Sequence, residues 1–276
     1  MAVTNMLGYI DKQSPVHKLS GVSKLIIFLL WSTIAMLTYD TRVLLILFVL
    51  SLVVFKLSKI KWQEISFVVW FILFFLALNN VAIYLFSPEE GVSIYNSSHV
   101  LFEMTNRYTV TLEQLFYQFN ITLKYFVVIP AALLFIVTTH PSEFAASLNK
   151  IGVHYKIGMA ISLALRYIPD IQRDFRTIAQ VQQARGIDLS NKEKLTKRLK
   201  NVVAIIMPLI FSSLDRIETI SNAMELRSFG KHNKRTWYSE RPLTKLDYLT
   251  LLISSLLFIL FMIITFHDGT RFYNPF

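Results

Sequence analysis

Two arginines lie at equivalent places in the sequence, each at the end of a long stretch with helical periodicity. Ala184-Arg185-Gly186 ends the first stretch and Leu226-Arg227-Ser228 ends the second. One interpretation is local, because a cation in the last turn complements the helix dipole and helps to satisfy the final carbonyls. The other is recognition, because a guanidinium offers five N–H donors in a planar fork that fits an acidic groove. Recurrence on adjacent helices favours a partner with two equivalent receptors.

The remaining reactive side chains lack the spacing that catalysis or metal binding requires. The chain has no cysteine, which excludes disulfides, thiolate metal sites and a cysteine nucleophile. Its six histidines show no HExxH or other ligand spacing, so no metal site is expected, and there is no GxxxxGK[ST] loop to bind ATP. Asp215, Glu218 and His232 leave an integral membrane enzyme open as an alternative, although they form no acid–base constellation.

The elements that must position the two arginines belong to a membrane protein. Of the 276 residues, 54% are hydrophobic and 17% are charged, whereas soluble domains average about 45–50% and about 25%. Stretches of apolar residues long enough to cross about 30 Å of hydrocarbon indicate spanning helices. Five spans are predicted, at about 25–39, 43–57, 63–86, 121–139 and 247–266. We therefore expect an all-α polytopic protein with about five transmembrane helices, of which the short first two form a hairpin.

Lysines and arginines indicate the orientation of the chain, because cytoplasmic loops carry an excess of them. Residues 140–245 hold 18 Lys+Arg against 9 Asp+Glu, which accounts for most of the net charge of +10. The N-terminus and this segment are expected in the cytoplasm, and the C-terminus outside. The basic cluster at 192–200 either binds anionic headgroups or only retains the segment inside.

Three parts of the chain follow from these assignments. Residues 1–139 form a membrane domain with four spans, 140–243 a helical cytoplasmic domain, and 244–276 the fifth span with a short external tail. No ionisable residue is expected at the middle of a span, which argues against a stand-alone carrier, the second alternative. Residues 100–119 are expected to form an outer helix, either interfacial or without function.

The cytoplasmic part is expected to contain three helices. They cover roughly 141–152, 157–185 and 199–227, and the two longer ones are amphipathic. Pro169 and Pro208 are expected to bend the axes of these helices or to mark their true beginnings.

Four segments together resemble the transmembrane T components (the EcfT family, CbiQ-like) of energy-coupling factor (ECF) transporters. These segments are Ser14 to Leu19 with Lys24, His140 to Leu148, Leu165 to Pro169 with Gln183 to Gly186, and Met207 to Leu214 with Ala223 to Gly230. Any one of them is weak, but the combination is specific and extends over most of the chain.

The resemblance implies a non-catalytic coupling subunit in the cell membrane of a bacterium or archaeon. It would join two ABC-type ATPases, which carry ATP and Mg, to a small substrate-binding membrane protein (S component), for uptake of a vitamin or of another micronutrient such as cobalt or nickel. The chain itself would bind the lipid bilayer, no cofactor, no metal and no nucleic acid. The implied ATPase-docking residues are Ala184, Arg185, Gly186, Leu226, Arg227 and Ser228, and those that shape the coupling helices are Arg166, Pro169, Pro208, Glu225 and Gly230. The second motif, Leu226-Arg227-Ser228, differs from Ala-Arg-Gly, which is the commoner motif in the family.

Overall fold

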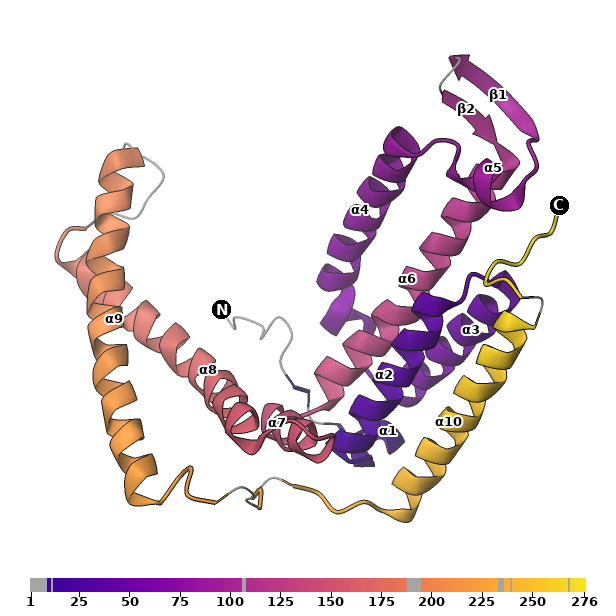
Figure 1. Ribbon diagram of the computed structural model, residues 1–276. Coiled ribbons are helices and arrows are strands. Elements are labelled where there is room, and N and C mark those ends of the chain that lie inside the picture. Colours follow the sequence, from indigo (N-terminus) through magenta and orange to yellow (C-terminus); the bar gives the residue numbers. More distant parts are fainter. Residues whose placement is uncertain are drawn as a thin grey trace. The chain divides into compact units, whose positions relative to one another are not determined.

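The computed structural model describes residues 9–10, 12–105, 108–187, 195–232, 236–238, 240–267 and 269–276. The chain divides into two compact units. Figure 1 labels the helices and strands of each. The first, here called the membrane unit, comprises Met1–His140 and Arg241–Phe276, and the second, the coupling unit, comprises Pro141–Glu240.

The membrane unit is built almost wholly from helices. Its elements are α1 (Pro15–Lys18), α2 (Gly21–Leu37), α3 (Thr41–Leu57), α4 (Trp62–Phe86), α5 (Glu90–Tyr95), β1 (Val100–Thr105), β2 (Tyr108–Thr111), α6 (Leu112–Thr138) and α10 (Lys245–Phe266). Three segments in the described part of the chain, Ile65–Phe86, Leu112–Thr138 and Lys245–Phe266, are long and apolar enough to cross a membrane, and α2 is a shorter apolar helix. The chain is thus a polytopic helical membrane protein, and a count of five spans stays a prediction.

Helix α6 forms the centre of the membrane unit. Helices α2, α3 and α4 all pack on it, and α2 and α3 are joined by a short turn at residues 38–40. The apolar core consists of Ile34, Ala35, Val43, Leu47, Val127 and Phe261. Four helices therefore contribute to one core, with α10 completing it from the far end of the sequence.

Helix α4 exposes most of its surface and is fastened to α6 by polar groups. The Asn80 side-chain amide donates to Thr122 Oγ1 at 3.2 Å, and Gln118 Nε2 donates to the Asn80 carbonyl oxygen at 3.2 Å. Large apolar side chains such as Phe67 and Trp70 are exposed along the helix. Near the start of α4, Ile65 is buried in an apolar cluster with Leu133, Leu134 and Val137 of α6. These hydrogen bonds and this packing hold the helix in place, and lipid can cover the rest of its surface.

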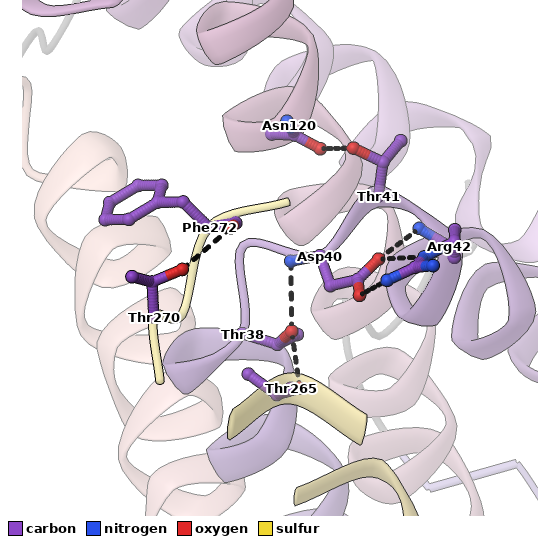
Figure 2. Close-up of polar contacts among 8 residues, drawn as sticks. All are labelled: Thr38, Asp40, Thr41, Arg42, Asn120, Thr265, Thr270 and Phe272. Carbon is purple, nitrogen blue, oxygen red and sulfur yellow. Dashed lines mark hydrogen bonds and ion pairs between the residues drawn. The ribbon is translucent and has the colours of Figure 1, made fainter. Parts of the chain in front are cut away.

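The end of the membrane unit away from α1 is held by buried polar side chains (Figure 2). The Thr265 hydroxyl contacts the Thr38 hydroxyl at 2.8 Å, and Thr41 donates to Asn120 Oδ1 at 2.7 Å. Asp40 caps α3 by accepting from the Arg42 backbone N–H at 2.9 Å. These contacts join α2, α3, α6 and α10, so a single network fixes this end of the bundle.

Two expectations about this end are wrong. The segment that was expected to form one helix over residues 100–119 instead contains the antiparallel strands β1 (Val100–Thr105) and β2 (Tyr108–Thr111), after which Thr111 caps α6. The second concerns ionisable groups within the spans: Lys124 lies near the middle of α6. Its ammonium donates to the Met36 carbonyl oxygen at 2.9 Å and lies 3.0 Å from the centre of the Tyr39 ring. This carbonyl and this ring compensate for burial of the charge.

The opposite end, where α1 lies, is held in part by the N-terminal segment that resembles the T components, Ser14 to Leu19 with Lys24. Lys24 Nζ donates to the Thr138 carbonyl oxygen at 2.6 Å, which joins α2 to α6. Asp247 accepts from the Ser20 backbone N–H at 2.8 Å and from the Thr244 N–H, completing a capping box on α10. This part of the motif is therefore structural.

The coupling unit contains α7 (Pro141–Lys150), α8 (Tyr155–Ala184) and α9 (Leu195–Leu226). Pro169 and Pro208 lie inside α8 and α9, so neither marks the beginning of a helix. Residues 192–194 of the basic cluster at 192–200 lie outside the described residues, the remainder lies in the first turns of α9, and Lys200 is exposed.

Candidate docking site

The end of α8 is a closed helix terminus in which Arg185 is the C-cap residue. The Gly186 N–H donates to the Gln183 carbonyl oxygen at 2.9 Å, and the Ile187 N–H donates to that of Gln182 at 3.0 Å. This pair of bonds is a Schellman motif, which needs a left-handed residue directly after the cap. Gly186, with φ of 84°, supplies it.

The end of α9 has the same hydrogen bonds around Arg227. The Ser228 N–H donates to the Glu225 carbonyl oxygen at 2.8 Å, and the Phe229 N–H donates to that of Met224 at 2.9 Å. Here the left-handed residue is Ser228, with φ of 53°, rather than a glycine. Both predicted motifs thus place their arginine at the same position of the same backbone structure.

Both arginine side chains reach the surface of the coupling unit. Arg185 and Arg227 are exposed, as are the flanking Ala184, Gly186 and Ser228. Leu226 is 88% exposed, an unusual value for a large apolar side chain. In the part of the chain that the structure describes, no acidic side chain forms an ion pair with Arg185. The Arg185 guanidinium is therefore available to a partner.

The two arginines lie at opposite ends of the α8–α9 pair. The Tyr155 ring, at the start of α8, contacts the Phe229 ring just after α9 at 5.5 Å between centroids. Near the end of α8, Gln182 Nε2 donates to the carbonyl oxygen of Ala204, early in α9, at 3.2 Å. The helices are therefore antiparallel, and at about 1.5 Å per residue the arginines are on the order of 40 Å apart. One small ligand cannot bridge that distance.

An ion pair joins the middle of the two helices. Arg216 Nη2 donates to Asp174 Oδ2 at 2.6 Å, and both side chains are half-buried. The Arg216 guanidinium also lies 5.8 Å from the Tyr167 ring centre. The polar faces of the two amphipathic helices therefore meet each other at this point.

The apolar stripes of α8 and α9 remain exposed. The large apolar side chains on these helices include Ile171, Phe175, Ile210, Leu214 and Ile217, and each exposes 39% to 60% of its surface. Such a surface on a monomer marks a site for another protein or for lipid.

The other predicted residues are spread along the helices, and two of them, Glu225 and Gly230, lie within three residues of Arg227. Arg166, Pro169, Pro208 and Glu225 are exposed along α8 and α9, and Gly230 has φ of 93° in the turn after α9. They do not converge on one another. Among the described residues, no group of three His, Cys, Asp or Glu side chains is placed to hold a metal ion.

One contact that positions the coupling helices was missed. The Trp237 indole Nε1–H donates to Asn149 Oδ1 at 3.2 Å, and the ring covers Gly158, where a Cβ would lie 3.1 Å from it. This packing holds the segment after α9 against α7 and α8. A glycine inside a helical stretch was the available signal, since it allows close approach.

Comparison with known proteins identifies relatives of this chain over most of its length. The family model described as cobalt transport protein (CbiQ) matches residues 12–238. The energy-coupling factor transporter transmembrane protein EcfT of Lactococcus lactis subsp. cremoris is 27% identical over 266 residues, which cover 93% of this chain and 95% of the relative. EcfT of Streptococcus equi subsp. equi is 28% identical over 239 residues, covering 83% and 85%. EcfT of Limosilactobacillus fermentum is 32% identical over 148 residues, covering 51% and 55%.

Proposed function

This chain belongs to the cobalt transport protein (CbiQ) family, as a transmembrane component of an ECF transporter, and we propose that it couples two ABC-type ATPases to an S component. In this proposal it is a non-catalytic subunit, and ATP with Mg is bound by the ATPases. The observation that carries the proposal is the pair of exposed arginines in matching helix termini at opposite ends of α8 and α9.

The arrangement suits two separate receptors. Each arginine would enter an acidic groove on one ATPase, where a planar guanidinium binds carboxylates with two parallel hydrogen bonds. Closure of the ATPase pair on ATP would move the two anchored ends relative to each other. Because the Asp174–Arg216 pair joins the helices between those ends, the movement would change the angle at which they cross.

The exposed apolar stripes supply the surface on which that change would act. Leu214 and Ile217 are exposed on α9 and Phe175 on α8, and an apolar membrane protein would bury them. We assign this surface to the S component, which carries the micronutrient, a vitamin or a transition-metal ion. A change in the helix crossing would then tilt or release the S component.

Charge reversal at the two helix ends tests the docking role. The double variant Arg185→Glu/Arg227→Glu, co-expressed with the two ABC-type ATPases of the proposed complex, is expected to lose at least nine-tenths of the ATPase that co-purifies with the full-length wild-type chain. Like charges facing each other cost several kcal/mol at an interface. The matched control is Arg173→Glu/Arg176→Glu, which reverses two exposed cations of α8 away from its end. Equal co-purification in both variants would reject the proposal.

A second variant separates the two partners. Leu214→Glu/Ile217→Glu is expected to retain the ATPases and to lose the S component, because charges within an apolar interface are costly to bury. Substrate uptake by this chain in vesicles without any ATPase would instead favour a stand-alone carrier. Turnover of a lipid by the purified chain alone would favour a membrane enzyme.

A further inference from the structure

A cavity of about 370 Å³ lies within the membrane unit, in the half of the bundle near α1. Helices α2, α3, α6 and α10 form its walls, and Pro15, Val16 and Leu19 of the α1 segment border it. The apolar core around Val127 and Phe261 lies beyond it on the same helices. Its volume falls within the range of about 300–1,000 Å³ that is typical of ligand pockets.

The lining of this cavity suits hydrocarbon rather than a polar compound. Its surface consists almost entirely of carbon atoms, and the cavity is partly open. Of the polar side chains that border it, Ser51 donates to the Phe48 carbonyl oxygen at 2.7 Å and Ser254 to that of Thr250 at 2.8 Å. Lys24 donates to the Thr138 carbonyl oxygen. The donors of these three side chains bind backbone. The Trp31 indole N–H and the Thr138 hydroxyl, on two other lining residues, are buried and have no hydrogen-bond partner in the described part of the chain, but the accessible lining is almost wholly apolar.

Three lysines lie next to the cavity at the end of the bundle where α1 is found. Lys18, Lys56 and Lys245 each directly precede a leucine that lines it. All three are exposed, and none forms an ion pair with an acidic residue in the described part of the chain. Cations beside an apolar cavity match a ligand with an apolar body and an anionic head.

The depth of the cavity matches one leaflet of a bilayer. Its lining on α10 runs from Leu246 to Leu257, which spans about 16 Å at about 1.5 Å per residue. Half of a hydrocarbon core of about 30 Å is about 15 Å. A molecule that fills it with its head near Lys245 would thus extend from the headgroup region to about the bilayer centre.

We propose that this cavity binds an acyl chain of an anionic phospholipid whose phosphate lies among Lys18, Lys56 and Lys245. The lipid would come from the leaflet at the α1 end and would fill the space between α3 and α10. This site is independent of the two arginines, since no residue of the coupling unit lines it. Loss of lipid binding and loss of ATPase docking are therefore separate results.

The test is native mass spectrometry of the purified full-length chain with phosphatidylglycerol or phosphatidylcholine of identical acyl chains. We expect one phosphatidylglycerol to be retained, with at least fivefold lower retention of phosphatidylcholine. Ser254→Phe, which places a ring in the cavity, is expected to lower retention at least tenfold. Ser255→Phe is the matched control, because the neighbouring Ser255 is exposed and does not line the cavity. Equal retention by these two variants would overturn the proposal.

The lysines are tested separately, so that the proposal does not depend on folding of a cavity variant. Lys18→Gln/Lys56→Gln/Lys245→Gln is expected to lower retention of phosphatidylglycerol to the level of phosphatidylcholine, while retention of phosphatidylcholine stays the same. Equal retention of the two lipids by the wild-type chain would also overturn the proposal, since the lysines would then contribute nothing.

Discussion

The C-terminal ends of α8 and α9 share one backbone structure although their flanking residues differ. Both place an exposed arginine at the C-cap and close the helix with the same pair of hydrogen bonds. The end of α8 uses glycine in the left-handed position, and the end of α9 uses serine. A residue with a Cβ pays about 1–2 kcal/mol for that conformation, so α9 keeps the shape at a cost that α8 avoids.

This difference indicates that the geometry of the arginine, rather than the glycine beside it, is the shared feature of the two motifs. The contact between Tyr155 and Phe229 helps α9 to bear the cost, because it packs the residue that follows Ser228 against the start of α8. At the α8 end, Ile187 follows Gly186 and donates the equivalent backbone hydrogen bond, to the Gln182 carbonyl oxygen. The two ends should then respond differently to the same substitution while serving equivalent receptors.

The largest expected effect tests the equivalence of the two receptors. Arg185→Ala and Arg227→Ala, made separately, should each weaken ATPase binding at least tenfold, or about 1.4 kcal/mol, because each removes one charged docking group. Titration of the purified chain with fluorescently labelled ATPase measures both affinities. Arg176→Ala is the control, and a large loss in only one of the two variants would show that the ends are not equivalent.

An intermediate effect separates the backbone requirements of the two ends. Gly186→Ala should weaken the end of α8 by about 1 kcal/mol, because alanine disfavours positive φ, whereas Ser228→Ala should change the end of α9 little. Hydrogen exchange followed by mass spectrometry reports local opening, and about 1 kcal/mol corresponds to roughly fivefold faster exchange. Similar acceleration in both variants would contradict the difference inferred from Gly186 and Ser228.

The sequence predicted the helices of both units because their apolar patterns are long. It also placed Arg185 and Arg227 at helix ends, since Gly186 and Gly230 are strong stop signals. It did not identify Ser228 as the left-handed residue, because glycine two positions later is the stronger local signal. The choice depends on tertiary packing of Phe229 against Tyr155.

Long-range polar contacts were beyond the reach of the sequence. The bond from Ser20 to Asp247 joins residues 227 positions apart, and no local pattern encodes it. The paired strands Val100–Thr105 and Tyr108–Thr111 were missed because a short apolar run does not distinguish a strand from a helix by periodicity. The cavity near α1 likewise depends on how four helices are arranged in space, and the apolar pattern of each helix alone does not specify that arrangement.

The smallest expected effect is a gain of stability. Ser228→Gly should stabilise the end of α9 by up to about 1 kcal/mol, because glycine adopts positive φ without a steric cost. Its amides should then exchange up to fivefold more slowly, measured on peptides that cover residues 222–229. ATPase affinity should stay unchanged, because Arg227 keeps its place at the C-cap. If affinity falls although exchange slows, the serine hydroxyl itself contacts the ATPase, and the two receptors read different residues beside the same arginine.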